Sequence, residues 1–416
     1  MEKLALFGGP KAKTKPFADG KRFGEEEKKE VLEVLDSDIL FYVFGSKVRE
    51  MEAKMREMYR MKHCNGCSSG TAAVHIALGS LQLPPGKEVI TSAITDMGTL
   101  TGILYQCLIP RFADIDPETY NLDPAEVEKL VTDKTGAIVV VHHAGLPAEI
   151  EELKSIAEKH GLPLVEDCAQ AWFTHYQERL CGTFGDISAF SLNHFKLITS
   201  GSGGMVLTNR DDLEETVKLF IDKCYFRDGR KRNPYFLAPN YQMTELQGAV
   251  AKVQLDRIAG IVQRRNALGM RLIRGLDTIP GVIPQKVPEG REHSFFLLVV
   301  RLDPGVISAT VARFCEALGA EGIPAEANKI TGGMATYLYD VFQNRSAFPD
   351  SMFPFVSRDL GSDVAYPKGL CPRAETAFEQ TFNLNISEFY STEDIDDMIR
   401  ATEKVARYYR GNRSAE

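Results

Sequence analysis

The chain has 416 residues, a mass of 46.2 kDa and a formal net charge of −8 at pH 7. This length is sufficient for two domains with substantial cores, and the acidic balance excludes a general attraction to nucleic acid or to anionic membranes. The sequence contains no run of 18 or more apolar residues, and its first residues include no long apolar segment. We therefore expect no signal peptide, no membrane span and a cytoplasmic location.

The N-terminal part of the sequence predicts a helix over Glu25–Leu35 and a loop with three aromatic residues over Asp38–Gly45. From about residue 60 to residue 220, apolar runs of strand length alternate with amphipathic stretches, which indicates a mostly parallel sheet in an α/β layer. The predicted strands are Glu88–Thr91, Pro110–Ile115, Ala137–His142, Leu162–Glu166, Ile187–Leu192 and Met205–Thr208. The predicted helices are Thr71–Leu81, Thr95–Leu108, Pro124–Thr132, Ala148–His160 and Asp211–Ile221.

The pattern changes in the last third of the chain. Helical periodicity extends from Tyr241 to about Leu276, and Ile279–Glu292 is rich in proline and glycine, as a linker would be. A predicted strand over His293–Leu302 and a final helix over Thr392–Tyr409 belong to a shorter α+β unit. We therefore predict a large cofactor-binding domain over residues 1–276 and a smaller C-terminal domain over residues 277–416.

Eight cysteines are scattered along the sequence without a framework. Cys64 and Cys67 form a C-x-x-C pair, but no second pair follows, so small residues packed at the end of a strand are favoured over a metal or redox pair. We expect no metal site.

Lys196 follows a predicted buried strand and precedes the small residues Gly201 to Gly204. A lone lysine in such a place is usually a solvated surface group. Here, however, Asp167 lies 29 residues earlier, at the end of another predicted strand. A fixed amine, a tight cavity and an acid that tunes a cofactor are what a Schiff-base lysine needs.

Three further segments accompany this lysine. Ser69, Gly70 and Thr71 open a predicted helix, where backbone N–H groups and the Thr71 hydroxyl could bind a phosphate. Asp167 ends a strand at the edge where open α/β sheets bind ligands, and its carboxylate could hold a proton on a pyridine nitrogen. The segment Pro239–Ala249 is a polar turn that enters a long helix.

Together and in this order, these segments resemble the DegT/DnrJ/EryC1/StrS aminotransferases. The resemblance extends from the opening Leu4–Pro10 to Tyr366-Pro367 near the C-terminus. It implies the aspartate aminotransferase architecture (fold type I), pyridoxal 5′-phosphate (PLP) as cofactor, and sugars or cyclitols as substrates. The fold expected is thus a large domain with a mostly parallel sheet flanked by helices, plus a smaller C-terminal α+β domain.

The resemblance also implies catalytic roles. Lys196 would form the internal aldimine and then act as the acid and base that moves the proton. Asp167 would pair with the pyridinium nitrogen and, beside a cationic ring, remain ionised.

The remaining implied roles are contacts to the cofactor. Gln170 would bind the phenolic oxygen and Ala169 would pack on a ring face, whereas Gly70, Thr71 and Ser191 would bind the phosphate. Asn240 would reach the phosphate from the neighbouring subunit, so that a homodimer with shared active sites would be the smallest complete catalyst.

Two positions depart from the family pattern. Family members usually place an aromatic residue next to the threonine aligned with Thr95, where it stacks on the cofactor ring, but this chain has Asp96. Either another group covers the ring or Asp96 points elsewhere. Many members also have an acidic residue where this chain has Ser202.

The predicted function is a PLP-dependent aminotransferase that moves an amino group from glutamate or glutamine to a keto-sugar or keto-cyclitol, in ping-pong order. The resemblance of the opening segment Leu4–Pro10 to one branch of the family favours a scyllo-inosose-like ketone as the acceptor. Alternatives are a sugar dehydratase or a 3-amino-5-hydroxybenzoate synthase-like enzyme of the same family, and a non-catalytic regulator or scaffold. Family dehydratases have histidine at the lysine position, and this chain retains Lys196.

Several smaller signals stay open at this stage. The histidines His142 and His143, at the end of a predicted strand, are either structural or in contact with substrate. Trp172 either lines the pocket or packs in the core. The basic segment Arg227–Arg232 is either a solvated loop or crosses a dimer interface to meet a negative group on the substrate.

Overall fold

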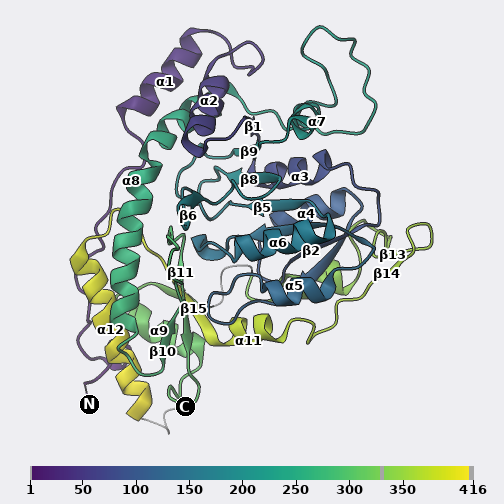
Figure 1. Cartoon of the computed structure of the whole chain (residues 1–416). Coiled ribbons are helices and arrows are strands. Elements are labelled where there is room, and N and C mark those ends of the chain that lie inside the picture. Colours follow the sequence, from purple (N-terminus) through teal and green to yellow (C-terminus); the bar gives the residue numbers. More distant parts are fainter. Residues whose placement is uncertain (1, 328–331, 412–416) are drawn as a thin grey trace.

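The computed structural model describes residues 2–327 and 332–411. Its larger part is built on a seven-stranded sheet in the order β1-β9-β8-β5-β4-β2-β3, with helices on both faces (Figure 1). Strand β9 runs antiparallel to both of its neighbours, and the other neighbouring pairs are parallel. The predicted α/β class with a mostly parallel sheet is therefore confirmed. The strands are β1 His63–Cys67, β2 Glu88–Ser92, β3 Ile109–Ala113, β4 Thr135–Val141, β5 Leu164–Asp167, β8 Ile187–Ser191 and β9 Gly204–Thr208.

The predicted helices of this part occur with small shifts at their ends. The largest shift concerns the helix predicted over Thr95–Leu108, because Asp96 caps it and Cys107 adopts a positive φ of 55° just beyond its end. The helices are α1 Glu25–Asp36, α2 Lys47–Tyr59, α3 Gly70–Ser80, α4 Met97–Tyr105, α5 Pro124–Leu130, α6 Ile150–His160 and α7 Asp211–Ile221. A short 3-10 turn, η2 His143–Gly145, and a small hairpin, β6 His175–Tyr176 with β7 Arg179–Leu180, complete this part.

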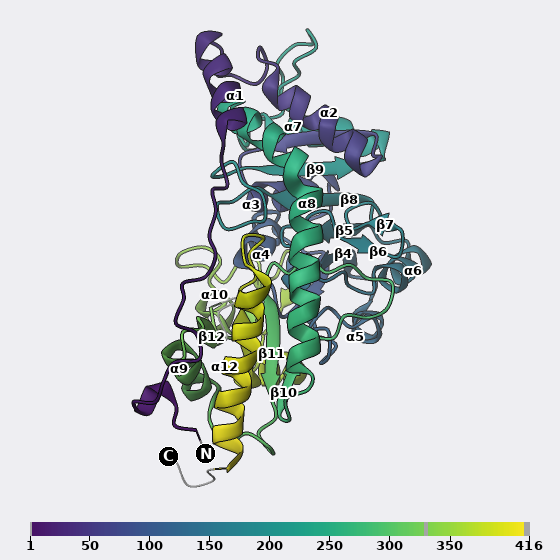
Figure 2. The same ribbon diagram turned by 90° about the vertical axis from the view of Figure 1, so that its left-hand side faces the viewer.

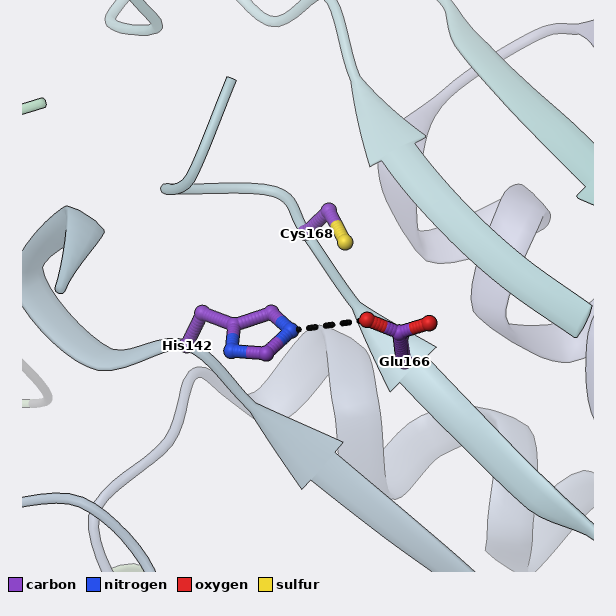
Figure 3. Close-up of side chains that lie close together, drawn as sticks. All are labelled: His142, Glu166 and Cys168. Carbon is purple, nitrogen blue, oxygen red and sulfur yellow. Dashed lines mark hydrogen bonds and ion pairs between the residues drawn. The ribbon is translucent and has the colours of Figure 1, made fainter. Parts of the chain in front are cut away.

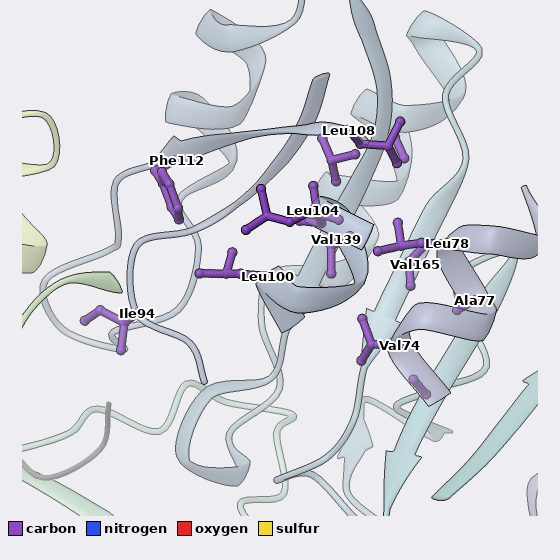
Figure 4. Close-up of a cluster of buried hydrophobic side chains, with 14 of the residues drawn as sticks. Val74, Ala77, Leu78, Ile94, Leu100, Leu104, Leu108, Phe112, Val139 and Val165 are labelled. Atoms are coloured by element: carbon purple, nitrogen blue, oxygen red, sulfur yellow. The ribbon is translucent and has the colours of Figure 1, made fainter. Parts of the chain in front are cut away.

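Two apolar clusters cover the two faces of the large sheet. In the first, side chains of α3 and α4 pack on β4 and β5, as Figure 4 shows for Leu78, Leu100, Val139 and Val165. The second joins α2, α6 and the first half of α8 to the opposite face. The strands are buried on both faces, which explains their continuous apolar runs.

The smaller part contains a four-stranded antiparallel sheet in the order β10-β11-β15-β12. The long helices α8 and α12 lie side by side next to it in both views (Figures 1 and 2). The elements are α8 Glu245–Leu276, β10 Val282–Pro284, β11 Leu298–Leu302, α9 Val311–Ala320, β12 Ala325–Ala327, β15 Thr381–Leu384 and α12 Thr392–Gly411.

Two segments cross between the parts. Residues 335–378, here called the strap, pack on the first cluster of the large sheet through Tyr337, Phe342, Phe355 and Tyr366. A third apolar cluster joins α8, α9 and α12 to the smaller sheet. In the opposite direction to the strap, the N-terminal segment begins in this cluster with Leu4 and runs along the molecule to α1 (Figure 2). The domain boundary between residues 276 and 277 stays a prediction. The strap contains η4 Thr336–Leu338, α10 Asp340–Gln343, β13 Val356–Ser357 and β14 Ser362–Asp363 and extends into α11 Pro372–Gln380, and the N-terminal segment contains η1 Ala5–Phe7. No helix within the described residues is both long enough and apolar enough to cross a membrane.

Candidate active site

The candidate site lies where the carboxyl ends of two neighbouring strands meet the starts of two helices. Asp167 ends β5 and Ser191 ends β8, and these strands are adjacent and parallel. Gly70 begins α3, and Asp96 is the residue before α4. Ligands of open α/β sheets bind at this edge.

Asp167 is buried and is held by two hydrogen bonds. Its Oδ2 accepts from the Thr99 hydroxyl at 2.8 Å, and its Oδ1 accepts from the backbone N–H of Ala169 at 3.0 Å. The Thr99 hydroxyl has one proton, and it donates this proton to Asp167. The Thr95 hydroxyl, 2.7 Å away, therefore donates to Thr99. Burial raises the pKa of the Asp167 carboxyl, and the bonds from Thr99 and Ala169 and the charge of Lys196 offset this only in part. A cationic group beside Asp167 would stabilise its ionised form.

Lys196 lies in the turn between β8 and β9, with its Nζ 4.6 Å from the centre of the Phe296 ring. Burial lowers the pKa of the Lys196 ammonium by more than the negative charges of Asp167 and Asp96 raise it. A lysine with a lowered pKa has a larger neutral fraction and is a better nucleophile near neutral pH.

Arg22 holds the backbone on both sides of Lys196. Its guanidinium donates to the carbonyl oxygens of His194 at 2.6 Å and Leu197 at 3.1 Å, and also to that of Lys196 itself. No sequence signal indicates this contact, because a single arginine 174 residues away belongs to no motif.

Arg265 of α8 holds the backbone of the segment that contains Phe296 in the same way, by donating to carbonyl oxygens. It is buried and donates to the carbonyl oxygen of Phe295 at 2.7 Å, and it pairs with the Glu388 carboxylate at 2.9 Å. Glu388 also raises the pKa of the Arg22 guanidinium, against the larger lowering by burial. Two arginines and one carboxylate therefore fix two walls of the site.

Gly70 allows α3 to begin directly against the end of β8. A Cβ on Gly70 would lie 2.5 Å from Cβ of Ser191 and 2.6 Å from its hydroxyl oxygen. The Ser69 hydroxyl accepts from Ala72 N–H at 3.0 Å, whereas the N–H groups of Gly70 and Thr71 have no partner within the described residues. Free N–H groups at the start of an 11-residue helix, next to two hydroxyls, favour an anion.

Gln170 and Ala169 follow Asp167 in the turn after β5. Oε1 of Gln170 accepts from Ala144 N–H at 2.7 Å, so its amide NH2 is directed elsewhere, and in the described part of the chain this NH2 has no partner. Ala169 is half-buried beside it.

Asn240 is exposed and pairs through its backbone with Asp222, the residue after α7. Within residues 2–327 and 332–411, no hydrogen bond joins its side chain to the groups around Lys196. A single copy of the chain thus brings together the other predicted site residues but does not connect Asn240 to them.

Asp96, which stands where an aromatic residue was expected, is exposed and caps α4. Its Oδ1 accepts from Gly98 N–H at 2.8 Å. The aromatic group whose contact with Lys196 the structure does record is Phe296, from β11's leading segment.

His142, Glu166 and Cys168 form a buried cluster at the end of β5 (Figure 3). Successive side chains of a strand point to opposite faces, so Glu166 and Asp167 point to opposite faces of the sheet. Glu166 accepts from the backbone N–H groups of Gly182, Phe184 and Gly185 at 2.6–2.7 Å, and His142 Nε2 lies 3.1 Å from it. His142 Nδ1 accepts from Ala148 N–H at 3.1 Å. Burial alone would raise the pKa of the Glu166 carboxyl, but these bonds lower it. The cluster therefore fixes the residues on either side of Asp167.

Of the smaller signals, Trp172 packs in the core, whereas the roles of His143 and of the basic segment stay open. Trp172 is fully buried, and its Nε1 donates to the Ser191 carbonyl at 2.9 Å. The His143 ring is buried without a partner among the described residues, and burial lowers its pKa to about 4. Arg230 pairs with Asp228 at 2.6 Å and with Glu215 at 2.9 Å in the same chain.

The groups at this edge fit pyridoxal 5′-phosphate. An amine with a lowered pKa suits its aldehyde, a buried carboxyl suits its basic ring nitrogen, and free helix N–H groups beside Ser191 suit its phosphate. On a seven-stranded α/β sheet, these features define a fold type I PLP enzyme. The chain belongs to the DegT/DnrJ/EryC1/StrS aminotransferase family, which matches residues 21–403.

Individual relatives agree with this assignment. The chain is 34% identical over 334 residues to a candidate L-glutamine:3-amino-2,3-dideoxy-scyllo-inosose aminotransferase of Streptoalloteichus tenebrarius, covering 78% of this chain and 79% of the relative. It is 30% identical over 380 residues to the L-glutamine:2-deoxy-scyllo-inosose aminotransferase of Micromonospora echinospora, covering 87% of this chain and 86% of the relative.

The fold is similar to that of a crystal structure of 3-amino-5-hydroxybenzoic acid synthase. The TM-score is 0.83 at 24% identity, with 95% of this chain and 100% of the other covered. The protein is an aminotransferase that uses PLP, in a family that modifies sugars and cyclitols.

Proposed function

We propose that this enzyme transfers an amino group from glutamine or glutamate to a keto-cyclitol of the scyllo-inosose type. The observation that supports the chemistry best is that a buried Asp167 and a Lys196 amine of lowered pKa lie near enough at the carboxyl edge of the sheet for the charge of each to shift the pKa of the other. When bound, PLP supplies an aldehyde carbon and an electron-withdrawing ring that stabilises negative charge on the substrate carbon.

In this proposal, Lys196 holds the cofactor through Nζ in the resting enzyme and moves the substrate proton after the amino donor has displaced it. Its lowered pKa increases the neutral fraction of the amine, and a general base acts in its neutral form. Arg22 positions the turn, because its bonds to the carbonyls of His194 and Leu197 fix the backbone from which Lys196 extends.

Asp167 is proposed to bind the protonated ring nitrogen. Burial alone disfavours its charge, so the cationic ring and the carboxylate stabilise each other, and Thr99 and Ala169 fix the direction of the carboxylate. Gln170 would donate its free NH2 to the phenolic oxygen, and Ala169 would lie against the ring.

The phosphate is proposed to bind at the start of α3. The free N–H groups of Gly70 and Thr71 and the hydroxyls of Thr71 and Ser191 are the donors, and the helix dipole adds to them. The short distance between Gly70 and Ser191 supports this assignment, because it leaves room for backbone contacts to an anion and none for a side chain.

We further propose a homodimer in which Asn240 completes the phosphate site of the partner subunit. Large apolar side chains are exposed next to the site residues, which is unfavourable for a solitary chain. Phe195 beside Lys196 is 79% exposed, and Leu237, three residues before Asn240, is 97% exposed.

Borohydride reduction and donor loading test the proposal. Reduction of the holoprotein followed by peptide mapping should place the label on Lys196, and glutamine or glutamate should discharge the cofactor absorbance. Addition of 2-deoxy-scyllo-inosose should then restore it. A label on another residue would refute the catalytic assignment, and a ketone panel without any response would refute the acceptor class.

A further inference from the structure

Asp96 lies at the solvent side of the site wall, directly after the buried Thr95 and three residues before Thr99, which bonds Asp167. As the N-cap of α4 it uses Oδ1 to accept from Gly98 N–H at 2.8 Å. An N-cap requires only an oxygen acceptor, and asparagine or serine serves as well as aspartate. Helix capping therefore accounts for the acceptor at position 96 but not for its charge.

The second carboxylate oxygen of Asp96 has no hydrogen-bond partner within the described residues, and no cationic side chain among them lies within ion-pair distance. Asp96 also lies close to Thr71, because a Cβ on Gly98 would be 2.9 Å from Asp96 Oδ1 and 2.8 Å from the Thr71 hydroxyl. The charge of Asp96 reaches the centre of the site, since it raises the pKa of both Lys196 and Asp167.

This carboxylate adds negative charge to a site that already contains Asp167 and is proposed to bind a phosphate. The two arginines of the site are engaged with backbone carbonyls and, for Arg265, with Glu388. Among the described residues, Lys196 is a cation whose charge interacts with that of Asp96, but it forms no ion pair with Asp96 and is proposed to hold the cofactor in the resting enzyme. A cationic ligand is the partner that this local charge favours.

We infer that Asp96 determines specificity by binding an ammonium group on the ketone acceptor, so that the enzyme prefers a keto-cyclitol that already has an amino substituent. This inference rests on the function proposed above and narrows its substrate class. An ammonium group donates to the free oxygen of Asp96 with full charge assistance, whereas the hydroxyl of an otherwise identical ketone donates without it.

Two ketones that differ at this substituent test the inference: 3-amino-2,3-dideoxy-scyllo-inosose and 2-deoxy-scyllo-inosose. The holoenzyme is first loaded by glutamine, and the return of cofactor absorbance is followed with each ketone. We expect the aminated ketone to have the higher kcat/KM by about tenfold or more, as for a charge-assisted hydrogen bond that is partly exposed to water. In D96N, which retains the cap, this ratio should fall about tenfold, mainly through KM.

The controls separate charge from capping. D123N removes a charge at the cap of α5, where Asp123 accepts from Ala125 N–H at 2.9 Å and also pairs with Arg373 at 2.8 Å, and should leave the ratio unchanged. In wild type, KM for the aminated ketone should rise with ionic strength, and in D96N this dependence should be lost.

The outcomes are distinct. If both ketones react equally well in wild type, or if D96N keeps the wild-type ratio, the inference is refuted and the proposed function stands. If glutamine loads the enzyme and neither ketone responds, the proposed acceptor class fails and the inference fails with it.

Discussion

In the protein without cofactor, burial destabilises the ionised form of Asp167, and a cationic cofactor ring would stabilise it. Burial raises its pKa, so the native state binds a proton more tightly than the unfolded state does. By linkage, the free energy of unfolding of the apoprotein then falls as pH rises above the unfolded aspartate value of about 3.9 and levels off above the folded pKa. Once the cationic ring is bound, the Asp167 carboxylate should instead increase the free energy of unfolding.

The variant D167N tests this reversal. Without cofactor, its melting temperature should equal that of wild type near pH 4 and exceed it at pH 8, because the buried charge is gone. The amide oxygen can accept from Ala169 N–H, and the amide NH2 can donate to the Thr99 hydroxyl, whose proton then turns to Thr95. With cofactor, it should bind PLP more weakly and lose most activity. Thermal melts of both forms across pH provide the measurement, and an apo D167N that is less stable than wild type at pH 8 would contradict the argument.

At the scale of elements, the site depends on how closely α3 approaches β8. A Cβ on Gly70 would overlap Ser191, and both partners are fixed, one by the helix start and the other by the sheet. G70A should therefore displace the start of α3 and raise the dissociation constant for PLP at least tenfold, by losing phosphate hydrogen bonds. Cofactor titration followed by fluorescence measures the effect.

Gly260 gives a matched control. It lies in α8 and is exposed, and a methyl group added to its Cα would have no neighbouring atom within 4 Å. G260A should leave PLP affinity unchanged and raise stability by about 0.5–1 kcal/mol, because alanine loses less backbone entropy in a helix. If G70A and G260A bind PLP with equal affinity, contact between a Cβ at position 70 and Ser191 does not disturb the phosphate site.

The N-terminal segment acts on the site through Arg22. R22A leaves three backbone carbonyls around Lys196 without their donor, which should cost about 1–3 kcal/mol of stability and lower kcat more than it raises KM. Lys21 is exposed next to it, so K21A should match wild type in both. Denaturant unfolding and steady-state kinetics distinguish the two variants, and an R22A enzyme with unchanged kcat would show that the turn holds its position unaided.

The contrast between Gly70 and Arg22 shows what the sequence could predict. The local sequence pattern was sufficient to predict the strands and helices around Asp167, Ser191 and Gly70. Asp167 and Ser191 end apolar strands and Gly70 begins a helix, and the site lies at these ends. The contacts of Arg22 and Arg265 could not be predicted, because they join segments far apart in sequence through carbonyl oxygens that every residue possesses. Strand β1 was indicated only as a strand end at Cys64 and Cys67 and was absent from the predicted strands, since His63–Cys67 lacks an alternating apolar pattern and depends on pairing with β9. The residue roles, including that of Asn240, stay predictions.

At the scale of the whole molecule, the proposed role of Asn240 requires a second copy of the chain to complete each active site. Asn240 is exposed in a segment whose neighbours Tyr235 and Leu237 are also exposed, 65% and 97% respectively, and no bond links it to the Lys196 groups among the described residues. A second copy that covers these side chains would supply Asn240 from outside. Symmetry then requires each subunit to give one Asn240 and receive another.

Subunit complementation tests this arrangement. K196A lacks the amine, and N240D should repel the phosphate through its added charge, so each variant alone should have little activity at limiting PLP. If sites are shared, a mixed dimer contains one site with both Lys196 and Asn240 intact. Random reassociation of equal amounts should then restore about a quarter of wild-type activity, since half of the dimers are mixed and each has one of two sites. If Asn240 serves the Lys196 of its own chain, no mixed dimer has an intact site, and the mixture will have only the average activity of the two variants.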